Sequence, residues 1–350
     1  MHTGPQPLFI LGFARSGTTL LQRLLNSYDD VLIWGEHVGF LRDVANAYAL
    51  AWRNPDYFAS TVPLEDVLVD SRPLTRWQAW MNWTTPEEWR RLYREFLEAI
   101  FVPGGLPGRR VWGWKEVHYL RTAHDGTLPF LAELFPEARY VFVVRNGFDT
   151  MASFSIRPLR RSLAAWKHEG CLAWTRTVDA IRWWHDSGRL DSYLLRYEDL
   201  IEGRGELLRL LASLGKRLGD EQVAVLRAET ARGSSFAADT RGERWKQLSM
   251  LRRGIAFACL AATNRELGYE NPHVPLGARI AARAVSPVLA GIYYRSGFVR
   301  RAREILRDSG PASPPAVTAP LAVASAAPGA RAPHERSHAT TAAPSTTQRQ

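Results

Sequence analysis

Short apolar runs alternate with stretches of helical periodicity along most of this chain. The runs that predict strands lie at 8–11, 31–34, 111–114, 139–144 and 193–196. Apolar side chains recur every three or four residues in the stretches that predict helices, at 18–26, 37–52, 86–101, 128–135, 147–156, 162–187, 204–214, 220–231 and 248–267. Strands that alternate with helices predict an α/β fold, a parallel sheet with helices on both faces.

Two parts of the chain lack this periodic pattern. Residues 53–85 are rich in Pro, Trp and Arg without a clean period, and they predict an irregular insertion. From Asp308 on, the chain consists mainly of Ala, Pro, Ser and Thr, which bury too little apolar surface to offset the entropy of ordering. The predicted organisation is one domain at 7–275, a basic helical segment at 276–307 and a disordered tail at 308–350.

The cysteine content and the lengths of the apolar runs predict the cellular compartment of the protein. Only Cys171 and Cys259 occur, so a disulfide framework is not expected and a reducing environment fits. The N-terminus lacks the basic region of a signal peptide, and no run reaches the roughly 18 apolar residues of a spanning helix. These features predict a cytoplasmic protein.

The net charge of +10 comes mainly from the C-terminal region. Residues 276–307 hold seven Arg and one Glu, a net +6. The centre of this segment, Ala284–Tyr294, is apolar but short and is interrupted by Pro287. Two interpretations stay open: an amphipathic element on an anionic membrane, with the protein peripheral there, or a helix packed on the domain with a solvated basic face. The second is favoured, and no nucleic acid is predicted as a partner.

The segment Gly12–Thr19 (GFARSGTT), between a predicted strand and a predicted helix, has the character of a phosphate-binding loop. Successive backbone N–H groups there converge on an anion, and the helix N-terminus adds partial positive charge. The spacing equals that of the nucleoside-triphosphate P-loop, but Thr18 stands where that loop needs Lys, and the cation is Arg15 instead. The loop therefore suits an anion bound without a metal.

A second anion-binding element is Arg145, at the end of the strand 139–144, with Ser153 eight residues further on. Eight residues are about two helical turns, so both side chains could face one phosphate. The alternative is an Arg that forms a surface salt bridge.

Four segments resemble sulfotransferases that use 3′-phosphoadenosine 5′-phosphosulfate (PAPS). FILGFARSGTTLLQRLL is similar to their 5′-phosphosulfate loop, most closely in the tyrosylprotein, carbohydrate and bacterial branches. YVFVVRNGFDTMASFS resembles their 3′-phosphate motif, YLLRYEDLIEG their Tyr-Glu-Asp-Leu segment, and RWKQLSMLRRGIAFACLAATNRELGY their C-terminal helical segment. The resemblance covers roughly residues 7–270 in the family's order, and it implies a P-loop-type parallel sheet and a donor used without a metal.

The resemblance also implies roles for single residues. Glu36, just after the strand 31–34, resembles the family's catalytic base, and we expect that strand to run beside 8–11; the alternative is a Glu that caps the next helix. Lys115 resembles the family's lysine near the bridging oxygen. His118 is a rival base: it lies three residues after Lys115, whereas cytosolic sulfotransferases have their catalytic His two residues after a lysine. The residues that map onto the donor site are Arg15, Ser16, Gly17, Thr18 and Thr19 for the phosphosulfate, Arg145 and Ser153 for the 3′-phosphate, and Tyr197 near the nucleotide.

The resulting hypothesis is a sulfotransferase that moves the sulfuryl group of PAPS to a hydroxyl of a sugar, lipid, natural product or protein. Glu36 would be the base, and Arg15 and Lys115 would stabilise the leaving phosphate. Two alternatives are a P-loop kinase or other phosphotransferase, and a non-catalytic nucleotide-binding protein that docks on membranes. The sequence does not identify the acceptor or the oligomeric state.

Overall fold

The computed structural model describes residues 4–37, 39–53, 85–105, 107–120, 126–154, 162–233 and 244–308. The predicted irregular insertion, apart from its two end residues, and the predicted tail after 308 lie outside these ranges.

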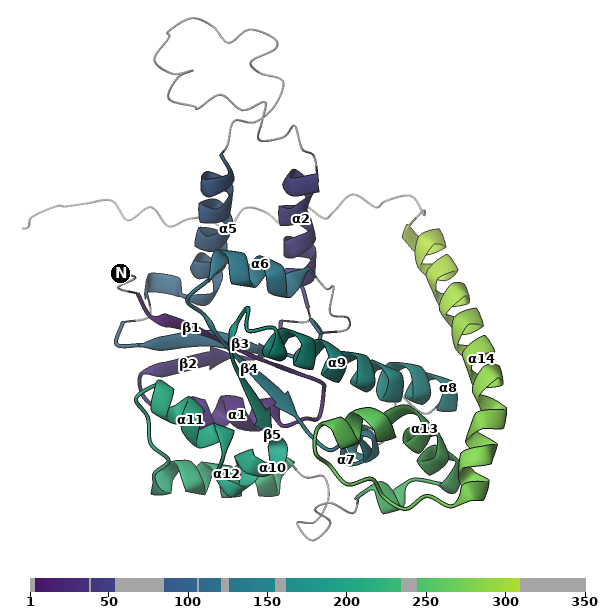
Figure 1. Cartoon of the computed structure of the whole chain (residues 1–350). Coiled ribbons are helices and arrows are strands. Elements are labelled where there is room, and N and C mark those ends of the chain that lie inside the picture. Colours follow the sequence, from purple (N-terminus) through teal and green to yellow (C-terminus); the bar gives the residue numbers. More distant parts are fainter. Residues whose placement is uncertain are drawn as a thin grey trace, which may run out of the picture. The chain divides into compact units, whose positions relative to one another are not determined.

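The described chain forms a five-stranded sheet in which every neighbouring pair of strands is parallel (Figure 1). Its order is β2-β3-β1-β4-β5, and helices flank it on both faces, which confirms the predicted fold class. The strands are β1 (Gln6–Gly12), β2 (Val31–Trp34), β3 (Val111–Glu116), β4 (Arg139–Val144) and β5 (Asp191–Arg196).

The expectation that the strand 31–34 runs beside 8–11 is wrong, because β3 lies between β2 and β1. All six residues of β3 are buried, whereas burial alternates along β2 and ends in an exposed Trp34, as suits an edge strand. Gly113 permits the close pairing of β3 with β1: a Cβ atom there would lie 1.7 Å from the Leu8 carbonyl oxygen.

The helices follow the predicted pattern closely. Thr85 accepts a hydrogen bond from the Glu88 N–H at 3.1 Å and so caps the helix that starts at Pro86. The helices are α1 (Thr18–Leu25), α2 (Leu41–Arg53), α5 (Pro86–Phe101), α6 (Thr127–Leu134), α7 (Gly147–Phe154), α8 (Leu163–Ala165), α9 (Leu172–Asp186), α10 (Tyr197–Glu202), α11 (Glu206–Ser213), α12 (Asp220–Gly233), α13 (Met250–Glu266) and α14 (Leu276–Asp308). Two 3₁₀ turns (Pro103–Gly105 and Arg244–Gln247) and a π-helical segment (Trp166–Cys171) between α8 and α9 complete the set.

Side chains alternate between the two faces of the sheet and build two cores. Leu8 and Ile10 of β1 pack with α1 and α11 on one face, while Phe9 and Leu11 pack with α2, α5 and α6 on the other. A third cluster joins α7, the π-helical segment, α13 and α14. The core therefore reaches beyond the sheet to the helices that follow β4 and β5.

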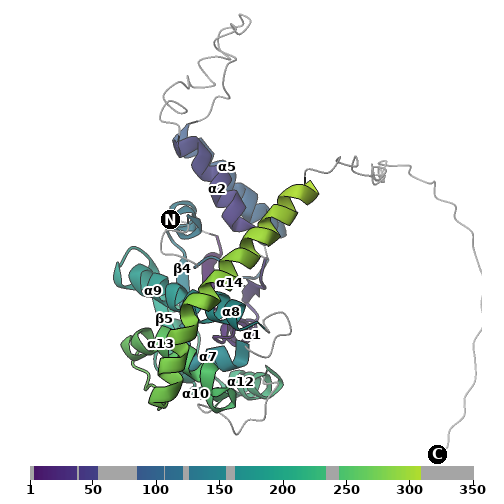
Figure 2. The ribbon, with the colours of Figure 1, turned by 90° about the vertical axis from the view of Figure 1, so that its right-hand side faces the viewer.

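The C-terminal helix α14 continues through Pro287, and it crosses the end of α8 and the region of α13 at a steep angle (Figures 1 and 2). The compact unit of the chain extends to Val299, within this helix. Among the residues that the structure describes, no helix, α14 included, is long and apolar enough to cross a membrane.

Candidate functional site

The expected site residues gather at one edge of the sheet. All five strands are parallel, so their carboxyl ends meet there, and ligands of open α/β sheets bind at this edge. The residues delivered at these ends are Arg15 after β1, Glu36 after β2, Lys115 near the end of β3, Arg145 after β4 and Tyr197 after β5.

The loop between β1 and α1 adopts a backbone that few residues tolerate. Gly17 has φ 100°, and a Cβ atom there would lie 2.4 Å from Cδ2 of Tyr197, so only glycine allows this ring against the loop. Arg15 has φ 73° and is the one non-glycine residue with positive φ in the described chain. Such a conformation costs roughly 1–2 kcal/mol and marks a functional constraint on the position of Arg15.

Two polar groups at this loop are buried without a hydrogen-bond partner in the described protein. They are Oγ of Ser16, which lies in the loop, and Nε of Arg145, at the end of β4. Buried donors are nearly always satisfied, and an unsatisfied pair beside a helix N-terminus points to an anionic ligand. The neighbouring Thr18 is buried at the first position of α1, which carries no side-chain cap.

The second predicted anion site adjoins the first. Nε of Arg15 donates to Oγ of Ser153, in α7, at 2.9 Å. Nη1 of Arg145 donates to the Arg15 carbonyl oxygen at 3.4 Å, and its guanidinium lies 4.2 Å from the centre of the Tyr197 ring. These contacts bring Arg15, Arg145, Ser153 and Tyr197 into one cluster, although 182 positions separate its ends in the sequence.

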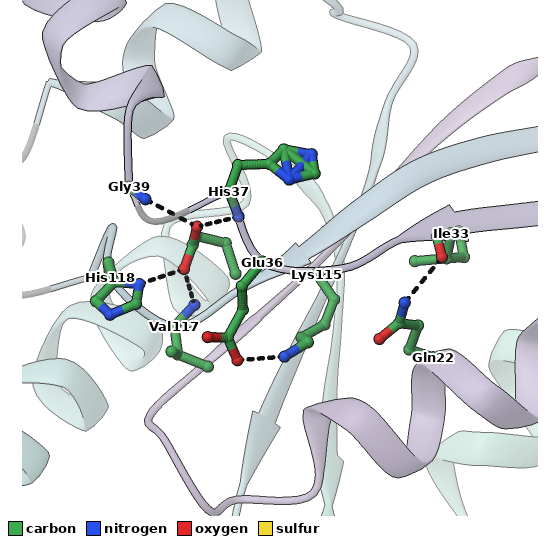
Figure 3. Close-up of polar contacts among 9 residues, drawn as sticks. Gln22, Ile33, Glu36, His37, Gly39, Lys115, Val117 and His118 are labelled. Atoms are coloured by element: carbon green, nitrogen blue, oxygen red, sulfur yellow. Dashed lines mark hydrogen bonds and ion pairs between the residues drawn. The ribbon is translucent and has the colours of Figure 1, made fainter. Parts of the chain in front are cut away.

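Glu36 and Lys115 form an ion pair on the other side of β1. Lys115 lies in β3 and Glu36 follows the end of β2. Nζ of Lys115 donates to Oε1 of Glu36 (Figure 3). Lys115 is buried, whereas the Glu36 side chain is 41% exposed. Glu36 does not cap a helix, because α2 begins only at Leu41. The pair therefore combines a protected cation with a carboxylate open to solvent.

Glu116, which the sequence analysis did not single out, is the buried anchor of this region. Its Oε2 accepts the N–H groups of His37 and Gly39 at 3.0 and 3.1 Å, and its Oε1 accepts the Val117 N–H at 2.8 Å and a bond from His118 (Figure 3). Burial would raise the pKa of Glu116, but the bonds from His118 and the backbone outweigh it and lower the pKa to about 2. The sequence feature that could have identified Glu116 as a buried carboxylate is its position inside the largely apolar run WGWKEV.

These bonds explain why α2 starts four residues later than predicted: the N–H groups of His37 and Gly39 bind Glu116 rather than continue a helix. The His37 ring stacks on Phe101 at 4.5 Å and points away from Glu36, and burial lowers its pKa (Figure 3). Nδ1 of His118 faces Glu116, so Nε2 is the nitrogen of His118 that can accept a proton.

Glu36, Glu116 and His118 lie close enough to be considered as metal ligands, with one ligand atom of each within 4.8 Å of the others. Both Glu116 oxygens already accept two hydrogen bonds each, and the Lys115 ammonium lies against Glu36. An adjacent ammonium repels a cation, so a metal ion at these three residues would have to compete with Lys115 for Glu36.

Comparison with known proteins identifies a family for this chain. Residues 7–220 match the model of the sulfotransferase family. No curated protein matches the chain. Three solved structures are similar to it: the sulfotransferase domain of the Synechococcus olefin synthase (20% identity, 81% of this chain and 96% of that one, TM-score 0.39), that of the curacin biosynthetic pathway (18%, 77% and 99%, 0.44) and the sulfotransferase STF9 of Mycobacterium avium (15%, 77% and 78%, 0.42).

Proposed function

The chain belongs to the sulfotransferase family, and we propose that it takes the sulfuryl group from PAPS and passes it, without a metal, to a hydroxyl of the acceptor. The observation that carries the choice of donor is the pair of unsatisfied buried donors, Ser16 Oγ and Arg145 Nε, at the ends of two adjacent strands. A donor with phosphate groups at both its 5′ and 3′ positions supplies acceptors for both.

The donor would bind along the carboxyl ends of β1, β4 and β5. The loop Gly12–Thr19 takes the 5′-phosphosulfate through its backbone N–H groups, its hydroxyls and Arg15. Arg145 and Ser153 take the 3′-phosphate, and the Tyr197 ring, against which Arg145 stacks, lies next to the nucleotide. The shared contact of Arg15 with Ser153 couples the two phosphate positions.

The chemical step is a displacement at sulfur. The acceptor oxygen forms a bond to sulfur, the bond from sulfur to the bridging phosphate oxygen breaks, and the acceptor proton passes to a carboxylate or imidazole. Glu36 is the proposed base because its side chain is exposed at the edge strand, where an acceptor has access. Arg15 and the buried Lys115 stabilise the charge that develops on the leaving phosphate.

His118 is the second candidate for the base. Glu116 holds it through Nδ1, which leaves Nε2 to accept a proton in the manner of a carboxylate–imidazole pair. Turnover of Glu36→Gln and His118→Asn distinguishes the two, measured with radiolabelled PAPS against a panel of sugar, lipid, phenolic and peptide hydroxyls. The base is the residue whose replacement abolishes turnover without weakening donor binding.

The donor itself is tested by calorimetric titration of the full chain with adenosine 3′,5′-bisphosphate, the desulfonated product, in the presence of a chelator. Binding is expected for this nucleotide and not for ATP, with or without magnesium. Arg145→Ala should abolish it. Arg139→Ala, at the opposite end of the same strand, is the matched control and should bind normally. Magnesium-dependent ATP binding would instead establish a kinase-type P-loop enzyme.

A further inference from the structure

One side of α14 is packed against the domain over most of its first five turns. Ala282 and Leu289 belong to the cluster formed with α7 and α13, and a Cβ atom on Gly254 of α13 would lie 2.1 Å from the Ala278 carbonyl oxygen. Nζ of Lys167 donates to Ser286 at 3.0 Å. The orientation of this part of the helix is therefore set by backbone approach, packing and a buried cation.

The opposite side of the helix is apolar and exposed. Leu276, Ile280, Val288 and Ile292 are 66%, 59%, 63% and 53% exposed. Each step of four residues turns the helix by about 40° beyond a full turn, so these four side chains wind across about 160° of the half of the helix that faces away from the packed side. A monomeric soluble domain seldom presents so many large aliphatic side chains on one helix, and such a surface marks an interaction site. The favoured expectation of a solvated basic face is therefore incomplete, because large apolar side chains dominate this side.

All the charges on this stretch have the same sign. Between Leu276 and Ser296 the chain contains Arg279, Arg283 and Arg295 and no acidic residue. All three arginines are exposed, and the Arg279 guanidinium also stacks on the Phe257 ring at 4.6 Å. If two copies of the chain packed through this side, these arginines would meet without an acidic partner from the same stretch, which disfavours a symmetric dimer.

We infer that α14 docks on an anionic lipid surface, with the apolar side chains between the headgroups and arginines paired with them. An interfacial helix has a hydrophobic side, basic residues and no capacity to span, and α14 has all three. The inference does not depend on sulfuryl transfer, because no residue of the donor site lies on this helix.

Flotation of the full chain with vesicles tests this surface. Binding is expected to vesicles of phosphatidylcholine with phosphatidylserine, more weakly to phosphatidylcholine alone, and to fall as salt is raised. Ile280→Gln with Val288→Gln should lower the partition coefficient by about tenfold or more. Each of Arg283→Gln and Arg295→Gln should lower it by about fivefold.

The matched controls are Leu208→Gln and Arg209→Gln, an exposed aliphatic and an exposed arginine on α11, and both should bind like the unmodified chain. Thermal unfolding reports whether each variant folds. If the double variant is destabilised, Ile292→Gln alone replaces it. Three results would overturn the inference: no binding to anionic vesicles at low salt, binding that survives the α14 replacements, or a dimer in solution that those replacements disperse.

Discussion

Replacing Glu116 by Gln removes one charge and should release one of two loops. The carboxylate accepts four hydrogen bonds, two on each oxygen, and all four donors are N–H groups. A Gln side chain keeps one acceptor and turns the other into a donor. If the NH₂ group faces His37 and Gly39, it opposes two backbone N–H donors; if it faces the other side, it opposes the Val117 N–H, whereas the His118 ring can change tautomer and accept. Either the loop after Glu36 or the segment of His118 is therefore held less firmly.

The size of the effect follows from the electrostatics of this carboxylate. Hydrogen bonds lower its pKa from 4.5 to about 2 although burial opposes them. That difference corresponds to about 3 kcal/mol of folding free energy, and the loss of one or two hydrogen bonds to a charged group gives an effect of similar size. The free energy of unfolding of Glu116→Gln should therefore be about 3 kcal/mol lower at neutral pH.

The effect depends on pH with a definite sign. The folded pKa lies below the unfolded one, so the stabilisation is complete above about pH 5 and is lost as the pH falls toward about 2. Denaturant unfolding of both proteins over this pH range measures it, and the difference between them should shrink steadily as acid is added. Glu116→Asp keeps the charge with a shorter reach, so it should retain the pH dependence with a smaller stability.

Glu270→Gln, an exposed carboxylate after α13, is the control and should change stability by less than about 0.5 kcal/mol. The reasoning is refuted if Glu116→Gln is as stable as the unmodified chain at neutral pH. It is refuted as well if the difference stays constant between about pH 5 and pH 3, because the carboxylate would then contribute no pH-dependent stability.

Three further substitutions test other contacts of the site and the sheet. Gly17→Ala strains the loop and overlaps the Tyr197 ring, so it should weaken binding of adenosine 3′,5′-bisphosphate at least about tenfold in calorimetry; unchanged affinity would contradict the loop conformation. Gly113→Ala places a methyl group on the Leu8 carbonyl oxygen and should lower the free energy of unfolding by at least about 3 kcal/mol; a loss below about 1 kcal/mol would argue against the β1–β3 register. Arg145→Lys removes the guanidinium that stacks on the Tyr197 ring and that can bind a phosphate through two N–H groups. It should reduce the affinity for adenosine 3′,5′-bisphosphate about tenfold while the thermal unfolding temperature stays the same. Retained affinity would exclude Arg145 from the site.

Local sequence patterns predicted most of the strands and helices and the turn at Gly12–Thr19. Each of the five predicted strands occurs in the structure, and so does the turn from strand to helix at Gly12–Thr19. Both depend on residues within about ten positions of one another, where alternation, periodicity and cap residues act directly on the backbone. The family resemblance rests on the same kind of contiguous segment.

These local patterns do not show contacts between residues that lie far apart in the sequence. Lys115 lies 79 positions from Glu36, and Arg15 lies 138 from Ser153. Glu116 was missed for the same reason, because its four donors come from two loops that only the β2–β3 pairing brings together.

The sequence by itself determined the elements, the P-loop-type turn and the sulfotransferase family, because each is written in neighbouring residues. Only the tertiary structure decided that β3 separates β2 from β1, that Glu116 anchors the loops of Glu36 and His118, and that α14 turns aliphatic side chains outward. The physical reason is that the hydrophobic periodicity of a segment shows which of its side chains share one face of a helix or strand. Which other element packs against that face depends on packing throughout the core.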